Sequence, residues 1–335
     1  MHVTAYFALL VAMLVCLAGA ATALFGLWKR DALRLPLLER AHHVVFAATA
    51  LASVILTVAL WRRDFSFMYV AEYTDTLLPL FYAVTAFWAG QAGSLLFWML
   101  ALAVFGAGFA LSRSYRDLGA ATRCGYWLFF FTIEAFFLLL LTGPSNPFLE
   151  AVPPLAEGRG LNPLLRNPGM IFHPPLLFLG YAGFAIPACL ALSGWLVGEK
   201  RPFAAVARNT VILSWIFLTA GIILGGWWSY MELGWGGYWA WDPVENASLI
   251  PWLVGTAFLH TAIVERRTKA LPKTNVAMAV ITFVTCILGT YLVRSGVVES
   301  LHAFGEGGVG GPLLLFMLFS LVVMAATLLD RKSAV

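Results

Sequence analysis

Nine long apolar runs dominate this sequence and leave it few folds to adopt. A helix rises about 1.5 Å per residue, so about 20 apolar residues cross a hydrocarbon layer of roughly 30 Å. Composition agrees, because 61% of the residues are hydrophobic and only 11% are charged. We expect an all-α, polytopic transmembrane protein. The predicted spans cover residues 3–27, 41–61, 87–111, 124–142, 171–197, 210–226, 246–264, 275–293 and 311–329.

The basic residues gather in alternate loops, and this asymmetry predicts the orientation of the spans. Cytoplasmic loops of membrane proteins carry an excess of lysine and arginine. Of 21 basic side chains, sixteen fall in one set of loops. The five in the other set are Arg62, Arg63, Arg159, Arg166 and Arg294. We therefore expect the N-terminus and residues 225–246 outside and the C-terminus inside. The outer face lacks the basic surface that nucleic-acid binding requires.

One apolar stretch, from Leu77 to Leu111, is too long for a single crossing. Two crossings would place Arg113 and Arg116 outside, against the charge rule. We expect residues 77–90 to form an interfacial or re-entrant segment that leads into one span. The four cysteines lie in apolar runs without CxxC spacing, so we expect buried thiols without a disulfide or metal.

The stretch GGWWSYMELGWGGYWAWDPVENASLIPWL, residues 225–253, has an unusual composition. It holds six of the thirteen tryptophans, three acidic residues and no basic residue. Indole rings offer flat apolar area, and Gly234, Gly236 and Gly237 remove side chains where a partner could approach the backbone. The pattern favours a surface for a flat apolar ligand. The alternative for each tryptophan is an aromatic belt at the membrane interface.

Two histidines fall on the same predicted outer face. His173 precedes Pro174 and Pro175, which we expect in the first turn of a helix, where a missing N–H is tolerated. His302 lies in the predicted outer loop of residues 294–310. Neutral imidazole is a common axial ligand of haem iron, so haem is a candidate ligand. The alternative for each is a solvated surface histidine.

A third histidine, His260, lies within a predicted span. It falls about 20 Å from the outer end of that helix at ~1.5 Å per residue. An ionisable side chain at such a depth is costly, and it marks a candidate functional site. The alternative is a neutral histidine bonded to a neighbouring helix. His42 and His43, near Arg40, are expected at the membrane interface.

Four motifs together resemble the CcmF family of haem-lyase membrane subunits in cytochrome c maturation: WGGYWAWDPVENASLIPWL, LNPLLRNPGMIFHPPLLFLGY, LVRSGVVESLHAF and GSLLFW. The resemblance covers essentially the whole chain. It implies a single transmembrane haem-handling domain over residues 1–335, with residues 225–253 as the outer WWD segment and residues 143–170 and 294–310 as loops that carry or flank haem ligands. One departure is Gly90-Gln91-Ala92, which stands where family members carry His and Glu.

The resemblance also implies site residues. His173 and His302 correspond to the outer iron ligands of a haem b. His260 corresponds to one ligand of a second haem b within the membrane, whose other ligand belongs to a region beyond Val335 or to a separate chain. The residues expected to line the outer haem are Trp227, Trp228, Trp235, Trp239, Trp241 and Asp242.

The haem propionates require cations, and the planar fork of arginine suits a carboxylate. Arg294 begins the loop that carries His302, and Arg166 precedes His173. We therefore expect Arg294 as the main propionate ligand and Arg166 as the second. The alternative for Arg294 is a side chain that extends from its helix end to the lipid headgroups.

The implied function is to hold haem at the outer face for thioether formation with a CxxCH apocytochrome c. No catalytic residue is assigned, so whether the chain is itself a haem lyase stays open. Expected partners are a haem chaperone, the apocytochrome with its thiol-reducing and presenting subunits, and a separate C-terminal half. The expected location is the inner membrane, with the active face toward the periplasm. The alternatives are a haem or quinol transporter that uses the same site and a structural subunit that binds partner proteins.

Overall fold

The computed structural model describes residues 1–29, 34–199, 203–300 and 308–329. Within these ranges nine helices are long and apolar enough to cross a membrane, with mean hydropathies of 1.6 to 2.5. They are α1 (His2–Lys29), α2 (Leu35–Arg62), α5 (Gln91–Ala110), α7 (Ala120–Thr142), α8 (Gly169–Val197), α9 (Phe203–Glu232), α10 (Pro243–Thr268), α11 (Pro272–Arg294) and α12 (Gly310–Leu329). All nine predicted spans are confirmed.

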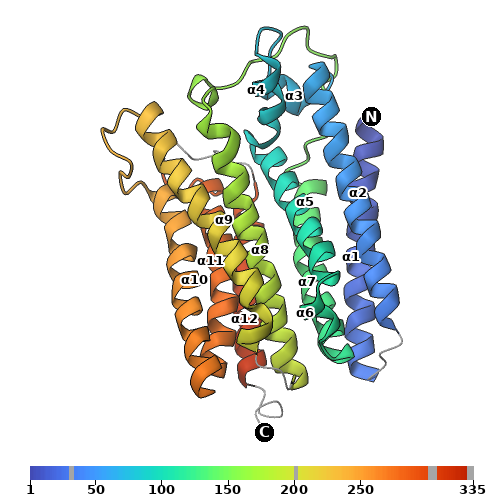
Figure 1. Ribbon diagram of the computed structural model, residues 1–335. Helices are drawn as coiled ribbons and strands as arrows, with labels where there is room; N and C mark the ends of the chain where they lie inside the picture. Colours follow the sequence, from blue (N-terminus) through green and yellow to red (C-terminus); the bar gives the residue numbers. More distant parts are fainter. Residues whose placement is uncertain (30–33, 200–202, 301–307, 330–335) are drawn as a thin grey trace.

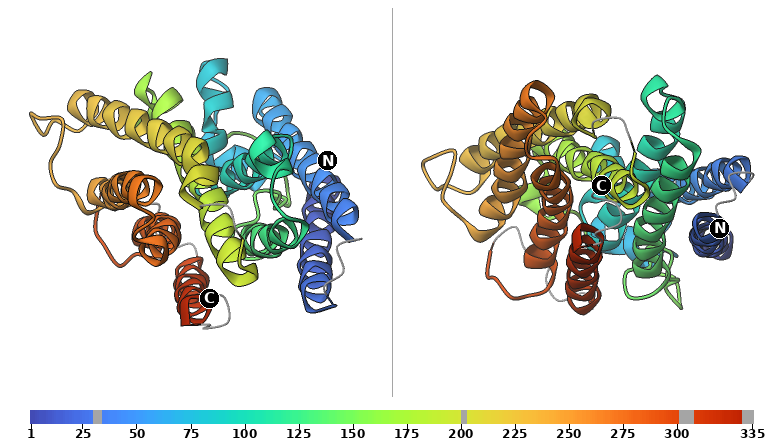
Figure 2. Two further views of the ribbon diagram at one scale, coloured as in Figure 1. Left: turned by 60° about the horizontal axis from the view of Figure 1, so that its bottom comes forward. Right: turned by 90° about the horizontal axis from the view of Figure 1, so that it is seen from below.

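The long helices run side by side in one bundle (Figure 1). α1 begins at the upper end in that view and α12 ends at the lower end, as an odd number of crossings requires. Seen along the bundle, α1 and α10 lie at opposite edges (Figure 2). α8 is central, because it packs against α5, α7, α9, α11 and α12. The side of the membrane that each end faces stays a prediction from the basic residues.

Short elements connect the spans. α3 (Met68–Tyr73), α4 (Leu80–Thr85) and the 3-10 turn η2 (Ala86–Trp88) lie at the upper end, and α6 (Arg113–Arg116) lies at the lower end. The Tyr69 hydroxyl lies 3.0 Å from the carbonyl oxygen of Phe87 and accepts a hydrogen bond from the Gly90 N–H. Residues 77–90 therefore form short helical turns that lead into α5 as a single span, as predicted.

Glycines allow α8 and α9 to approach closely. A Cβ atom on Gly180 would lie 2.8 Å from the Leu218 backbone nitrogen, and one on Gly221 would lie 2.8 Å from the Leu177 nitrogen. Small residues of this kind let helix backbones approach each other within a membrane. The contact fixes the half of α8 that carries His173 against α9.

The prediction that His42 lies at the membrane interface is wrong. Its side chain is buried, and its Nε2 lies 3.1 Å from Oε1 of Glu134, which is also buried. The Cys16 thiol lies 3.8 Å from the other carboxylate oxygen. Glu134 of α7 therefore contacts both α1 and α2 through polar groups inside the bundle. The four cysteine side chains are buried, as expected.

Candidate functional site

His173 lies one turn deeper in its helix than the sequence suggested. α8 begins at Gly169, whose N–H donates to the Asn167 side chain, so His173 is the fifth residue and the two prolines follow in the second turn. Proline at position 174 removes the helical donor to the Met170 carbonyl. The indole N–H of Trp88 replaces that donor at 2.9 Å. The early start of α8 is thus supported by side chains from two other segments.

The His173 ring has a defined orientation and tautomer. Its Nδ1 lies 2.7 Å from the Gly221 carbonyl oxygen of α9. A carbonyl can only accept, so Nδ1 carries the proton and Nε2 carries the lone pair. A Cβ atom on Gly225 would lie 2.4 Å from the imidazole, so only glycine leaves room for the ring there. A histidine held by one nitrogen and with a lone pair on the other is typical of metal ligation.

The tryptophan-rich segment is partly helical. α9 continues to Glu232, so Trp227 and Trp228 belong to its last turns, beyond the predicted end at residue 226. Trp228 is only 5% exposed and donates its indole N–H to the Leu164 carbonyl, with its ring parallel to His173 at 6.5 Å. Trp227 is 40% exposed and Trp241 71% exposed. Of the tryptophans expected to line the haem, Trp228 is therefore buried and packs beside His173, whereas Trp227 and Trp241 are exposed.

The loop of residues 233–242 presents open backbone and aromatic rings. Gly234 and Gly236 adopt φ values of +67° and +72°, which favour glycine, and a Cβ on either would meet no atom of the described residues within 4 Å. Within residues 225–253 the close approaches occur instead at Gly225 and Gly226, which the sequence argument did not single out. Trp235 is half-buried in this loop.

Trp239 offers a test of whether the segment suits haem. Its indole nitrogen is buried and has no hydrogen-bond partner among the described residues. Its ring meets that of Trp241 edge-on at 6.4 Å. A buried donor without an acceptor is costly, and a ligand carboxylate would supply one. The donor and the exposed rings fit a flat ligand with an acidic edge.

Asp242 caps α10. Its carboxylate accepts from the Val244 N–H, and Glu245 reaches back to the Asp242 N–H, forming a capping box. Ser300 donates a hydrogen bond of 2.8 Å to the same carboxylate, which ties the loop after α11 to the start of α10. His302 lies outside the described residues, two positions beyond this contact. Asp242 therefore shapes the site through α10 and the His302 loop.

The two candidate propionate ligands differ in exposure. Arg294 is 2% exposed and donates to the Gln91 carbonyl at 3.1 Å and to the Ser94 hydroxyl at 2.8 Å, at the start of α5. It does not extend toward the lipid headgroups. Arg166, after the 3-10 turn η3 (Pro163–Leu165), lies 3.4 Å from the Asp75 carboxylate and is partly exposed. The sequence could not show this difference.

The loops around Arg166 carry further polar contacts. Thr76 donates to Glu157, and this hydrogen bond lowers the pKa of the Glu157 carboxyl. Arg159 pairs with Glu72 at 2.8 Å. These contacts link residues 62–76 to residues 143–170, so the segment that precedes His173 is held to the bundle by several side chains.

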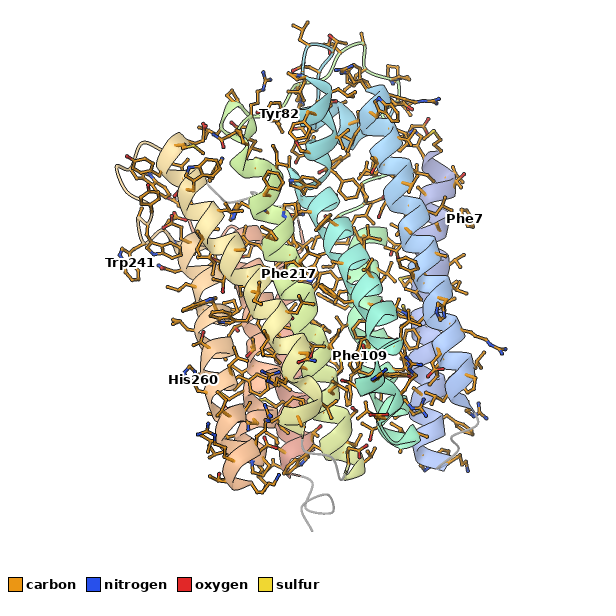
Figure 3. The ribbon with its side chains drawn as sticks, in the orientation of Figure 1. Phe7, Tyr82, Phe109, Phe217, Trp241 and His260 are labelled. Carbon is orange, nitrogen blue, oxygen red and sulfur yellow. The ribbon has the colours of Figure 1, made fainter. Side chains whose placement is uncertain are left out.

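His260 lies on the outward surface of α10, well below Trp241, which belongs to the loop before that helix (Figure 3). Its Nδ1 lies 2.9 Å from the Thr256 carbonyl of its own helix, so the alternative of a bond to a neighbouring helix is wrong. As with His173, the proton on Nδ1 leaves the lone pair on Nε2. The ring is exposed on the bundle surface, where a second chain or a ligand could reach it.

A pair of tryptophans above His260 was missed by the sequence argument. The rings of Trp215 and Trp252 stack at 5.7 Å between α9 and α10. Trp215 of α9 donates a hydrogen bond to Thr256 of α10, and Trp252 of α10 donates one to Thr219 of α9. The signal was present, because Trp252, Thr256 and His260 recur every four residues and so share one helix face.

We expect different effects on stability when the buried Trp228 and the exposed Trp241 are each replaced by alanine. Trp228→Ala removes a buried ring and its hydrogen bond, and we expect a loss of about 3–5 kcal/mol of stability. Trp241→Ala removes an exposed ring, and we expect stability within about 0.5 kcal/mol of wild type but weaker haem binding. Thermal unfolding and a haem titration of both variants check this. A large fall in stability for Trp241→Ala would show that this ring has a packing role.

Comparisons with known proteins agree with this architecture. A family model described as Cytochrome C assembly protein matches residues 88–300. The chain is 39% identical over 323 residues to the cytochrome c-type biogenesis protein NrfE of Haemophilus influenzae, covering 96% of this chain and 50% of that protein. It is 39% identical over 310 residues to CcmF of Escherichia coli K12, covering 91% of this chain and 47% of that protein.

A solved structure described as Cytochrome c Heme Lyase CcmF superposes with a TM-score of 0.83 at 31% identity. It covers 99% of this chain and 53% of that one, and the chain spans about half the length of the curated relatives it matches. The matched region includes α8, α9, α10 and α11, on which most of the candidate site residues lie. The chain is therefore a multi-pass membrane protein that belongs to the cytochrome c assembly family, with CcmF and NrfE of cytochrome c-type biogenesis among its relatives.

Proposed function

We propose that this chain holds haem b at the end of the bundle where α8 begins and presents it for covalent attachment to cytochrome c. The observation that carries the proposal is the His173 ring, fixed through Nδ1 on Gly221 with its lone pair on Nε2. His302 supplies the second iron ligand from the loop that Ser300 ties to Asp242. Neutral imidazoles on both sides would hold the iron.

The chemistry that follows is thioether formation with a CxxCH apocytochrome. Each cysteine thiol adds across a haem vinyl group: a carbon–sulfur bond forms, the carbon–carbon π bond breaks, and the thiol proton passes to the other vinyl carbon. No oxidant is consumed. The chain contributes position, because a reactant held within reach reacts faster by orders of magnitude. The exposed rings of Trp227 and Trp241 leave one side of the segment open to a partner.

The remaining roles extend the proposal to partners. His260, exposed on α10, is one ligand of a second haem b whose other ligand lies outside residues 1–335. A haem chaperone delivers haem, and thiol-reducing and presenting subunits deliver the apocytochrome. The site faces the periplasm from the inner membrane, since the basic loops lie at the opposite end of the bundle.

The visible spectrum of protein purified from haem-replete membranes tests this function. We expect the absorbance of a haem ligated by two histidines, lost when His173 and His302 are both replaced by alanine. A structural subunit would show no haem spectrum. A transporter would move haem across sealed vesicles that contain the protein, whereas we expect bound haem to stay accessible from one side only.

Arg294 gives a prediction about propionate recognition. Arg294→Gln should lower haem occupancy, because an arginine fork binds a carboxylate strongly and glutamine does not. Membrane insertion should stay intact. Because the side chain also holds the start of α5, haem binding must be separated from packing. Wild-type protein should bind haem more tightly than haem dimethyl ester, and Arg294→Gln should remove that preference. Equal binding of the two compounds by wild type would refute the assignment, and loss of the preference only in Arg166→Gln would transfer the role to Arg166.

A further inference from the structure

A cavity of about 170 Å³ lies at the lower end of the bundle in Figure 1, at the opposite end from His173. It lies where α8 and α10 end and where α7, α9 and α11 begin. Its wall is largely apolar, with Leu190, Phe203 and Val276 among the lining side chains. Since each helix is long enough to end near a membrane boundary, the cavity lies at the level of lipid headgroups.

The polar groups of the cavity include two carboxylates. Glu265 is only 5% exposed; Asn275 donates to its Oε2, and no described residue donates to its Oε1. Glu199 accepts from the Thr122 hydroxyl at 2.6 Å and from the Gly119 N–H at 3.2 Å. No cation among the described residues pairs with Glu265. A buried carboxylate of this kind calls for a donor with positive charge.

The same wall holds a donor that calls for an acceptor. The Trp195 indole nitrogen is buried and has no hydrogen-bond partner in the described part of the chain. The Lys273 ammonium lies 5.8 Å from the centre of that indole ring, on the first turn of α11. A negatively charged acceptor next to Trp195 would accept a hydrogen bond from its indole N–H and would also be attracted by the Lys273 ammonium.

We infer that this cavity binds the headgroup of a phospholipid with a primary ammonium, such as phosphatidylethanolamine. The ammonium donates to Glu265 and Glu199, the phosphate accepts from Trp195 and is attracted by Lys273, and the chains leave along the apolar wall. A metal ion is a poorer match, because no group of three histidine, cysteine or acidic side chains in the described residues forms a metal site. The inference is independent of the proposed haem site.

Native mass spectrometry of the purified full chain with equal amounts of dioleoyl phosphatidylethanolamine and dioleoyl phosphatidylcholine tests it. The choline headgroup has the same charge but no N–H to donate. We expect the wild type to retain about tenfold more of the ethanolamine lipid, the effect of one charge-assisted hydrogen bond. Equal retention of both lipids by the wild type would overturn the inference.

Variants and a competitor locate the site and its ligand. Glu265→Gln and Trp195→Phe should each reduce the preference, whereas Glu157→Gln, on the outer loops, should leave it unchanged. If both cavity variants keep the full preference, the cavity is not the site. Soluble phosphoethanolamine at the same concentration should displace none of the lipid, because it lacks the acyl chains. Complete displacement would make a soluble amine the ligand and refute a lipid site.

Discussion

Replacing His173 with alanine is expected to remove most of the haem that purifies with the wild-type protein. The change deletes an iron ligand whose orientation is set by the Gly221 carbonyl. Changes to groups that only orient a metal ligand already weaken metal binding about 10–100-fold, so loss of the ligand itself should weaken it at least as much. The ratio of haem absorbance to protein absorbance in purified samples measures the effect. His43→Ala is the matched control, because His43 is exposed and bonded only to Glu39 of its own helix.

A change that keeps the histidine tests its placement. Gly225→Val should also lower haem occupancy about 10–100-fold, because a Cβ there would lie 2.4 Å from the His173 ring and force it to move. Gly108→Ala is the control, since a Cβ at Gly108 meets nothing within 4 Å. Normal occupancy in Gly225→Val would show that the position of the ring against α9 does not matter for haem.

Glu134→Ala is expected to lower the stability of the protein by about 3–5 kcal/mol. The substitution leaves His42 buried without its partner and creates a cavity beside the imidazole, whose ring lies 4.7 Å from that of Trp127. Removing one member of a buried polar pair leaves the other desolvated and uncompensated. Thermal unfolding followed by tryptophan fluorescence measures the change.

Glu134→Gln provides the control for that prediction. A glutamine keeps an oxygen acceptor for His42 with nearly the same volume, so most of the stability should return. The haem content per folded molecule should not change in either variant, because the pair joins α1, α2 and α7 and lies away from the α8–α10 side. A stable Glu134→Ala protein would contradict the structural role of the pair.

The spans were predictable because each apolar run is long enough to require a helix in lipid. The start of α10 was also predictable from the sequence, because Asp242, Pro243 and Glu245 have the spacing of a capping box with proline at the first helical position. We instead assigned Asp242 to the haem site. The observed contacts of Asp242 show that it caps α10 and holds Ser300 near the start of that helix.

Other features depend on contacts between distant segments. The His42–Glu134 contact joins positions 92 residues apart, and no local pattern indicates it. The Arg294 side chain is directed to the start of α5, 200 residues earlier, rather than to the surface. Trp227 and Trp228 are neighbours in sequence, yet helical geometry exposes one ring and buries the other. These contacts and burial differences depend on which helix faces pack together. Short segments of one sequence do not show how distant helices pack.

Covalent haem attachment in membranes that contain the complete lyase is the most direct test of the account. The measurement is the amount of haem that stays bound to a CxxCH cytochrome after denaturation, with this chain either wild type or carrying His173→Ala and His302→Ala. We predict covalent product with the wild-type chain and almost none with the double variant, at equal levels of folded protein. Product formed at the wild-type rate without both histidines would contradict the claim that this chain holds and presents the haem.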